Sequence, residues 1–342
     1  MLIAKSSNFC QIKNLIEQNF GLIVNEFTSL RNVMFLQTNQ GEKILKKKKI
    51  LLSEHQFILQ ELTYLKEHNF FNTLSYHRNK VGEGFMLFDQ QIYVIMDRIH
   101  GEQCSYKNDL HLKTTTKTLA NLHLAGTGFH TLLKDRQVVG KLIPRLKKEL
   151  EELKFIKQLL QTNKPLTLFD DRVYGAIDEQ IRAAVEIIDD LSQTRYFDLC
   201  KESDKITICH HDLVDHNIII NNGEAFFIDF DDSIVDLKVH DLCNYLNRVE
   251  YFFEYDISKY YSLLNNYMTI NRLDHREWEI LFKMLLFPYD FCCLSKEYYD
   301  GRCTGTFQYS EDIYYQKLEH ILKNRSQKRE LFQQILNEKN YL

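Results

Sequence analysis

The sequence predicts an α+β protein: a small antiparallel sheet with one helix near the N-terminus, followed by a larger, mostly helical part. Pairs of short apolar or alternating segments lie within the first hundred residues, as in β-hairpins. Beyond them, apolar residues recur at steps of three and four, as on one face of an α-helix. The 342 residues include only 12 Gly and 3 Pro, so few breakers interrupt these helices.

Four strands are expected in the N-terminal part. Residues 32–37 and 42–47 run apolar or alternate on either side of the polar break Asn39-Gln40-Gly41, which is typical of a hairpin turn. Residues 85–88 and 92–96 form a second pair. Between the two pairs, apolar residues at helical spacing predict one helix, with Ser53 as its N-cap.

Helices dominate after Gly101. Asp109 is expected to cap a helix that ends near Gly126. Amphipathic patterns predict two long helices next, and a short β region interrupts the helical pattern before the C-terminal part of the chain. The long helices lie around 146–160 and 177–191, the β region at 206–230, and further helices over 233–342.

The change of element type near residue 100 predicts an N-terminal lobe, 1–97, and a C-terminal lobe, 98–342. With 43 Lys and Arg against 47 Asp and Glu, the net charge of −4 excludes the basic field of a general nucleic-acid binder. No stretch approaches the roughly 18 apolar residues of a membrane span, and no signal peptide is recognised. The 8 cysteines include no C-x-x-C pair, so reduced thiols and synthesis in a cytosol are expected.

Three oxygen-bearing side chains are expected to converge at one end of a hairpin. Asp212 and Asn217 lie on a loop that leads into a strand, Asn221-Asn222-Gly223 turns the chain back, and the return strand ends at Asp229. Phosphoryl transfer needs such a set, because one group accepts the proton of the attacking hydroxyl and oxygen ligands hold the Mg²⁺ that bridges the phosphates. The alternative is a zinc site made from Cys200, Cys209, His210 and His211, but adjacent histidines on one strand ligate a single metal poorly.

The motifs support a resemblance. His210-His211-Asp212 with Asn217 and Asp229-Phe230-Asp231 follow the order of the kinase pattern H-R-D-x-x-x-x-N and D-F-G, without the final glycine of protein kinases. The versions H-x-D-x-x-x-x-N and I-D-F-D resemble the aminoglycoside phosphotransferase and choline kinase family, whose acceptors are small molecules. Spore coat proteins of the CotS and YtaA (CotI) type carry similar segments in the same order, here 44–46, 209–212, 227–231 with 241–242, and 285–290.

The resemblance implies a kinase-like fold of two lobes, with ATP and Mg²⁺ as cofactors. Asp212 is then the catalytic base, and Asn217 and Asp229 hold the metal. Lys46, which strand phase favours over Lys47, contacts the nucleotide phosphates. Its partner is a glutamate of the following helix, Glu54 or Glu61, and spacing does not choose between them. The backbone of Met96, Asp97 and Arg98 binds adenine, Asp241 steadies the catalytic loop or caps its own helix, and His123 is structural.

Two functions remain open. The leading one is transfer of phosphate to a hydroxyl of a small molecule or a coat component, by a protein made in the mother cell and deposited in the endospore coat beside other coat proteins. The alternative is a structural or assembly protein that kept the fold without turnover. This alternative is favoured by the segment Phe27–Met34, which has no glycine where kinases cover the phosphates, so that Ser29 or Asn32 would have to contact them.

The acceptor itself is only weakly indicated. Asp215, Asp231 and Asp232 near the hairpin end favour a cationic acceptor. Tyr and Phe residues between 250 and 300 would suit an aromatic wall around a sugar or a cationic head group, although aromatic residues at helical spacing are more often part of a core.

Overall fold

The computed structural model describes the chain except residues 1, 31–32, 164, 253–255 and 338–342. Packing divides it into two compact units. The first unit contains Met1–Arg136 and His210–Ile234, and the second contains Gln137–Cys209 and Val235–Leu342. The predicted boundary at residue 97 marks the change of element type, whereas packing keeps the next helix and the 210–234 segment with the N-terminal sheet.

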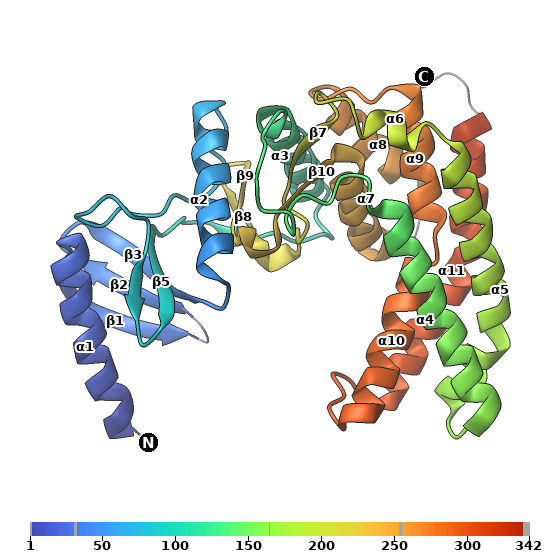
Figure 1. Cartoon of the computed structure of the whole chain (residues 1–342), viewed down its shortest axis with the longest axis horizontal. Helices are drawn as coiled ribbons and strands as arrows, with labels where there is room; N and C mark the ends of the chain where they lie inside the picture. Colours follow the sequence, from blue (N-terminus) through green and yellow to red (C-terminus); the bar gives the residue numbers. More distant parts are fainter. Residues whose placement is uncertain (1, 31–32, 164, 253–255, 338–342) are drawn as a thin grey trace. The chain divides into compact units, whose positions relative to one another are not determined.

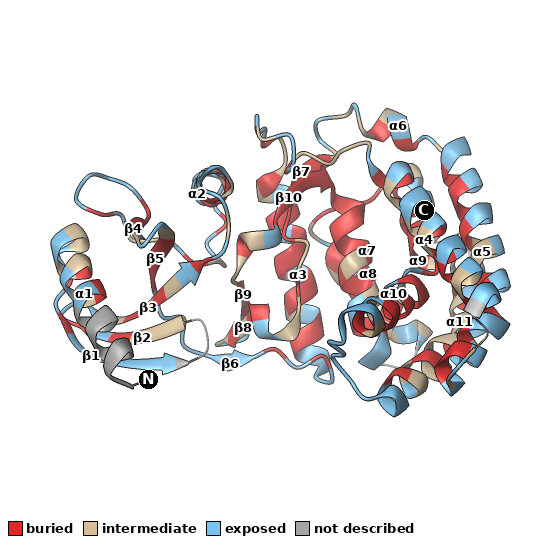
Figure 2. Cartoon of the chain, turned by 60° about the horizontal axis from the view of Figure 1, so that its bottom comes forward, coloured by how far each residue is buried: buried red, intermediate tan, exposed pale blue. Residues whose placement is uncertain are grey.

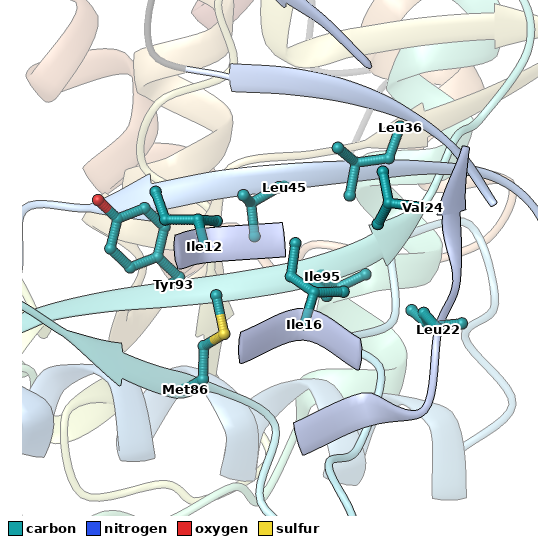
Figure 3. Packing of buried hydrophobic residues seen from close by; sticks show 9 residues of the cluster. All are labelled: Ile12, Ile16, Leu22, Val24, Leu36, Leu45, Met86, Tyr93 and Ile95. Carbon is teal, nitrogen blue, oxygen red and sulfur yellow. The ribbon is translucent and has the colours of Figure 1, made fainter. Parts of the chain in front are cut away.

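The first unit contains a five-stranded antiparallel sheet, which lies beside α1 (Figure 1). Its order is β1-β2-β3-β5-β4, and both predicted hairpins are present. Helix α1 (Leu2–Phe20) was not predicted, and neither was β1. Ile12 and Ile16 of α1 pack on one face of the sheet with Val24, Leu36 and Ile95 (Figure 3). The strands are β1 (Val24–Leu30), β2 (Val33–Thr38), β3 (Gly41–Lys48), β4 (Met86–Phe88) and β5 (Gln91–Asp97).

Both predicted helix caps are shifted. Helix α2 (Leu52–Glu67) has Leu51 rather than Ser53 at its N-cap, because the carboxylate of Glu54 accepts the Leu51 N–H at 2.9 Å. Helix α3 (Asp109–Gly126) is capped by the Asn108 side chain, which accepts the N–H of Leu110 at 2.9 Å. Asp109 therefore occupies the first turn, where a carboxylate still favours the positive end of the helix dipole.

A second, three-stranded sheet of the first unit contains the hairpin that lies between Asn217 and Asp229. Its order is β6-β8-β9, and β8 and β9 form the predicted hairpin. Helix α3 packs against β9, where the Thr118 hydroxyl donates to the carbonyl of Ala225 at 3.4 Å. The strands are β6 (Glu102–Gln103), β8 (Ile218–Asn221) and β9 (Glu224–Phe227).

The second unit is mainly helical. Strands β7 and β10 pair with each other, and α7 packs against β7 and α9. In Figure 2, α7 is largely red, whereas α5 alternates between buried and exposed residues, as expected for an amphipathic helix. The elements are α4 (Leu142–Asn163), α5 (Leu168–Gln193), α6 (Tyr196–Leu199), β7 (Ile206–Cys209), β10 (Ile234–Leu237), α7 (Lys238–Val249), α8 (Ile257–Met268), α9 (His275–Leu286), α10 (Tyr289–Thr304) and α11 (Glu311–Asn337).

The predicted fold class is confirmed: a small antiparallel N-terminal sheet with helices is followed by a larger helical part. Among the described helices, none is both long and apolar enough to cross a lipid bilayer. The seven cysteines whose side chains are described all carry free thiols.

Candidate active site

Asp212 and Asn217 are joined directly. The side-chain amide of Asn217 donates to Asp212 Oδ2 at 3.0 Å and to the Asp212 carbonyl oxygen at 3.0 Å. The Asn217 carbonyl oxygen in turn accepts the N–H of Ile228 at 2.9 Å, which ties the loop to the return strand one residue before Asp229. The predicted convergence of the loop and the strand end is thus found within the first unit.

The backbone at this point adopts rare conformations. Asp229 has φ 66° and ψ 68°, and His211 has φ 69°, both in the left-handed region that side chains with a Cβ avoid. The buried ring of His210 holds the segment, because its Nε2 lies 3.0 Å from the carbonyl oxygen of Ile228 and must carry the proton to donate there. Such strain persists only where the surroundings fix it, and it is common at functional sites.

Two lysines of β3 neutralise two aspartates that follow β9. Lys46 Nζ lies 2.6 Å from Asp229 Oδ1 and 3.3 Å from Asp231 Oδ2. Lys48, whose side chain is fully buried, pairs with Asp231 Oδ1. Burial raises the pKa of Asp231, but the two ammonium groups lower that pKa more, so it lies below its ordinary value. Sequence reasoning placed Lys46 here but did not identify Lys48.

Glu54 pairs with Arg136 and not with Lys46. Its Oε1 accepts a hydrogen bond from Arg136 Nη2 at 2.8 Å. The same buried guanidinium donates to the carbonyl oxygens of Asp231 at 2.7 Å and Ser233 at 3.0 Å. The expected Lys46–Glu54 ion pair is absent because Arg136 binds Glu54 and Asp229 binds Lys46. Arg136 therefore connects α2 to the segment after Asp229, a role for which no sequence motif gave a signal.

Glu61, the other glutamate considered, is fully buried and hydrogen bonded to Ser233. The Ser233 hydroxyl lies 2.6 Å from Glu61 Oε1 and 2.8 Å from the Phe230 carbonyl oxygen. A hydroxyl has one proton, and the Phe230 carbonyl can only accept, so both contacts are satisfied if Glu61 is protonated and donates to Ser233. Burial raises the pKa of Glu61 well above its ordinary value, which agrees with a neutral side chain.

A hollow of about 310 Å³ lies against β1 and β2, with Arg98 at its edge. The Arg98 guanidinium lies over the Phe35 ring, 5.2 Å from its centre, and the Arg98 N–H donates to the Glu42 carbonyl oxygen at 3.3 Å. Met96 and Asp97 belong to β5 and pair with Ile44 and Lys43 of β3. Of the three residues predicted to bind adenine, Arg98 lines this hollow, and Met96 and Asp97 do not. The other lining residues are Glu26, Phe27, Thr28, Phe35 and Gln37.

The remaining candidates differ in their positions. Ser29 lies in β1 opposite Met34, and Asn32 lies outside the described residues. Asp241 is buried in the first turn of α7, whose N-cap is Leu237, so Asp241 is not the cap of its own helix. His123 is buried in α3, in line with a structural role.

The environment of Cys209 argues against the alternative zinc site. Its thiol lies 3.7 Å from the Leu237 carbonyl oxygen and 3.8 Å from that of Asp236, where it acts as a donor. Burial raises the pKa of Cys209 well above its ordinary value. Zinc binds the thiolate, which this environment disfavours.

Comparisons with solved structures agree on the fold. The chain is similar to an aminoglycoside phosphotransferase from Alicyclobacillus acidocaldarius, with a TM-score of 0.79 at 15% identity over 93% of each chain. Spectinomycin phosphotransferase APH(9)-Ia, solved with ADP and spectinomycin, gives a TM-score of 0.60 at 15% identity over 94% of this chain and 96% of that one. Choline kinase LicA from Streptococcus pneumoniae gives 0.53 at 14% identity over 94% and 99%. At these identities the likeness shows the fold alone.

Sequence comparison gives the family. Spore coat protein S of Bacillus subtilis is 24% identical over 273 residues, which cover 79% of this chain and 77% of that protein. The model of the family described as "Spore coat putative kinase YutH" matches residues 13–335. The resemblance expected from the motifs is thereby confirmed, and the chain belongs to the YutH family of kinase-like spore coat proteins.

Proposed function

We propose that this protein is a phosphotransferase of the spore coat, which uses ATP and Mg²⁺ to phosphorylate a hydroxyl of a small molecule or a coat component. The observation that carries the proposal is the bonded pair of Asp212 and Asn217 next to Asp229, with Lys46 within 2.6 Å of Asp229. Spectinomycin phosphotransferase with ADP has the same fold and supports nucleotide use. Membership of the family supports synthesis in the mother cell and deposition in the coat.

The donor atoms suit Mg²⁺. The Asn217 amide nitrogen is turned to Asp212, so its carbonyl Oδ1 points elsewhere and accepts no hydrogen bond from the described residues. Asp229 uses Oδ1 for Lys46 and leaves Oδ2 without a partner in the same part of the chain. Mg²⁺ prefers one or two such oxygens together with water and phosphate oxygens, and it would neutralise charge on the phosphates.

In this proposal each residue of the candidate active site has a separate role. Asp212 accepts the proton of the acceptor hydroxyl, and the Asn217 amide keeps the Asp212 carboxylate in one orientation. The Lys46 ammonium exchanges Asp229 for the nucleotide phosphates, while Lys48 stays with Asp231. We assign the hollow that Arg98 and Phe35 line to the adenine base.

A coat protein without turnover is the second candidate. The segment Phe27–Met34 has no glycine, and Lys46 is paired with Asp229 instead of a helix glutamate. A backbone without glycine approaches phosphate less closely, and no described helix glutamate orients Lys46 toward a nucleotide.

ATP binding and turnover separate the two candidates. With Mg²⁺ and ATP the thermal midpoint is expected to rise, since a ligand that binds only the folded state stabilises it. Asp212→Ala should keep this shift but lose about 100-fold or more of turnover, measured over sugars, amino alcohols and aminoglycosides. Asp229→Ala should lose the Mg²⁺-dependent part of the shift, and Asp204→Ala, an exposed control, should change neither. Equal turnover of Asp212→Ala and the parent protein would refute the proposal, and absence of any shift would favour the second candidate.

A further inference from the structure

A second candidate site lies within the helical unit, in a cavity of about 50 Å³. Its walls come from the start of α4, from α7 and from the connection between α9 and α10, and they include the apolar side chains of Leu142, Leu146 and Met284. A volume of this size holds about four water molecules, or the core of a small organic ligand. The polar side chains of these walls include Arg145, Glu149 and Asn244.

Arg145 brings a positive charge to the cavity without a carboxylate partner. Its Nη1 lies 3.3 Å from Nε2 of the buried His240, and Nδ1 of that ring bonds to Asp236 Oδ2. A guanidinium can only donate, so Nε2 of His240 accepts and Nδ1 carries the proton. Among the residues that the structure describes, no carboxylate oxygen lies within 4.0 Å of the Arg145 guanidinium.

Glu149 brings the opposite charge, also without a partner. It follows Arg145 by one helical turn, a spacing at which side chains of opposite charge can reach each other. Here the two do not pair, and Glu149 has no basic group within 4.0 Å in the described ranges. The Asn244 amide, on α7, likewise makes no hydrogen bond to a described residue.

We propose that this cavity binds a small zwitterion of the size and charge pattern of an α-amino acid. Its carboxylate would take the planar, paired donors of the Arg145 guanidinium, and its ammonium would meet Glu149. Asn244 can serve either group, and the apolar walls accept a short side chain. The ligand would thus form one ion pair with Arg145 and another with Glu149, two residues that do not pair with each other. This site lies outside the residues assigned to phosphoryl transfer and does not depend on that function.

Calorimetric titration of the full chain with three related molecules tests the charge pattern directly. L-Serine carries both charges, ethanolamine lacks the carboxylate, and 3-hydroxypropionate lacks the ammonium. L-Serine is expected to bind at least about tenfold more tightly than either analogue, because each charged contact is lost in turn. Equal affinity for all three, or no saturable binding of L-serine, would overturn the proposal without any variant being made.

Variants then locate the site. Arg145→Gln should lower L-serine affinity about tenfold or more and leave ethanolamine affinity unchanged. Glu149→Gln should also lower L-serine affinity about tenfold or more, but leave 3-hydroxypropionate affinity unchanged. Arg182→Gln on α5 and Glu151→Gln on α4 make the same charge changes at exposed positions and should leave all three affinities within about twofold. Retention of L-serine affinity by Arg145→Gln or Glu149→Gln, with folding checked by circular dichroism, would exclude the cavity as the binding site.

Discussion

Each unit contains a cluster of two lysines and two acidic residues, and the two clusters are built for different purposes. In the second unit, Glu277 lies 3.0 Å from Lys205 and 3.2 Å from Lys238, and Asp274 lies 3.1 Å from Lys205. Glu277 is 1% exposed. In the first unit Lys48 is fully buried, whereas the side chains of Lys46, Asp231 and Asp229 are 18%, 23% and 34% exposed. The most exposed member of the second cluster is Asp274, at 29%.

The partners of the second cluster are also fixed by the backbone. Asp274 caps α9, and Glu277 accepts the N–H of Asp274 at 2.8 Å in a capping box. Lys238 donates in addition to Asn271 at 2.8 Å and to the Arg272 carbonyl oxygen at 2.9 Å. By contrast, Asp229 stands on strained backbone with one carboxylate oxygen to spare. The second cluster therefore holds α9 in place, whereas the spare oxygen of Asp229 suits the exchange of partners that the proposed function requires.

The largest expected effect comes from removing charge at Glu277. Glu277→Gln keeps the shape but leaves two largely buried ammonium groups with less compensation, and burial already lowers the pKa of Lys238. The expected loss is roughly 3 kcal/mol in the free energy of unfolding, measured by urea denaturation without nucleotide.

Removing one charge from the first cluster should lower the free energy of unfolding much less. Lys46→Met removes a partly exposed ion pair, for which about 1 kcal/mol or less is expected. Similar losses for Lys46→Met and Glu277→Gln would show that the two clusters do the same structural work, and the distinction between them would be wrong.

A smaller, pH-dependent effect separates two neighbouring aspartates. The pKa of Asp231 lies below its ordinary value, so its ion pairs stabilise the fold above about pH 4 and this stability is lost as pH falls through the lowered pKa. The pKa of Asp232 is raised, first by burial and then by Asp212 and Asp231. Its contribution has the opposite sign: it is complete below about pH 4 and declines as pH rises through the raised pKa.

Thermal midpoints between pH 2 and 7 measure both contributions. Asp231→Asn should lower the midpoint at pH 7 and flatten its fall in acid, whereas Asp232→Asn should raise the midpoint at pH 7. Changes of the same sign in the two variants would contradict the charge arrangement around Lys46 and Lys48.

The sequence predicted those parts of the site that lie close together along the chain. Asp212 and Asn217 are five residues apart, and a short hairpin brings the chain back to Asp229. Lys48 and Arg136 reach Asp231 across separations of 183 and 95 residues, and no local pattern records such contacts.

The fold shows the same limit. The two hairpins follow from apolar alternation and polar breaks, but β1 is an edge strand whose residues 25–29 are exposed, so it carries little alternation. Each cap was misplaced by one or two residues because Glu54 and Asn108, and not the predicted residues, reach the free backbone N–H groups.

The smallest expected effect concerns the two glutamates of α2, which differ in charge although they share one helix. If Glu61 is neutral, Glu61→Gln keeps a donor for Ser233 and should change stability at pH 7 by less than about 0.5 kcal/mol. Because the folded-state pKa of Glu61 is raised, its contribution is complete below about pH 4.5 and is lost as pH rises through that raised value, and the variant should remove this slope. Glu54→Gln replaces a charged partner of Arg136 and should cost more, about 1 kcal/mol. A loss for Glu61→Gln larger than that for Glu54→Gln would mean that Glu61 is ionised, and it would then be the glutamate available to a lysine of β3.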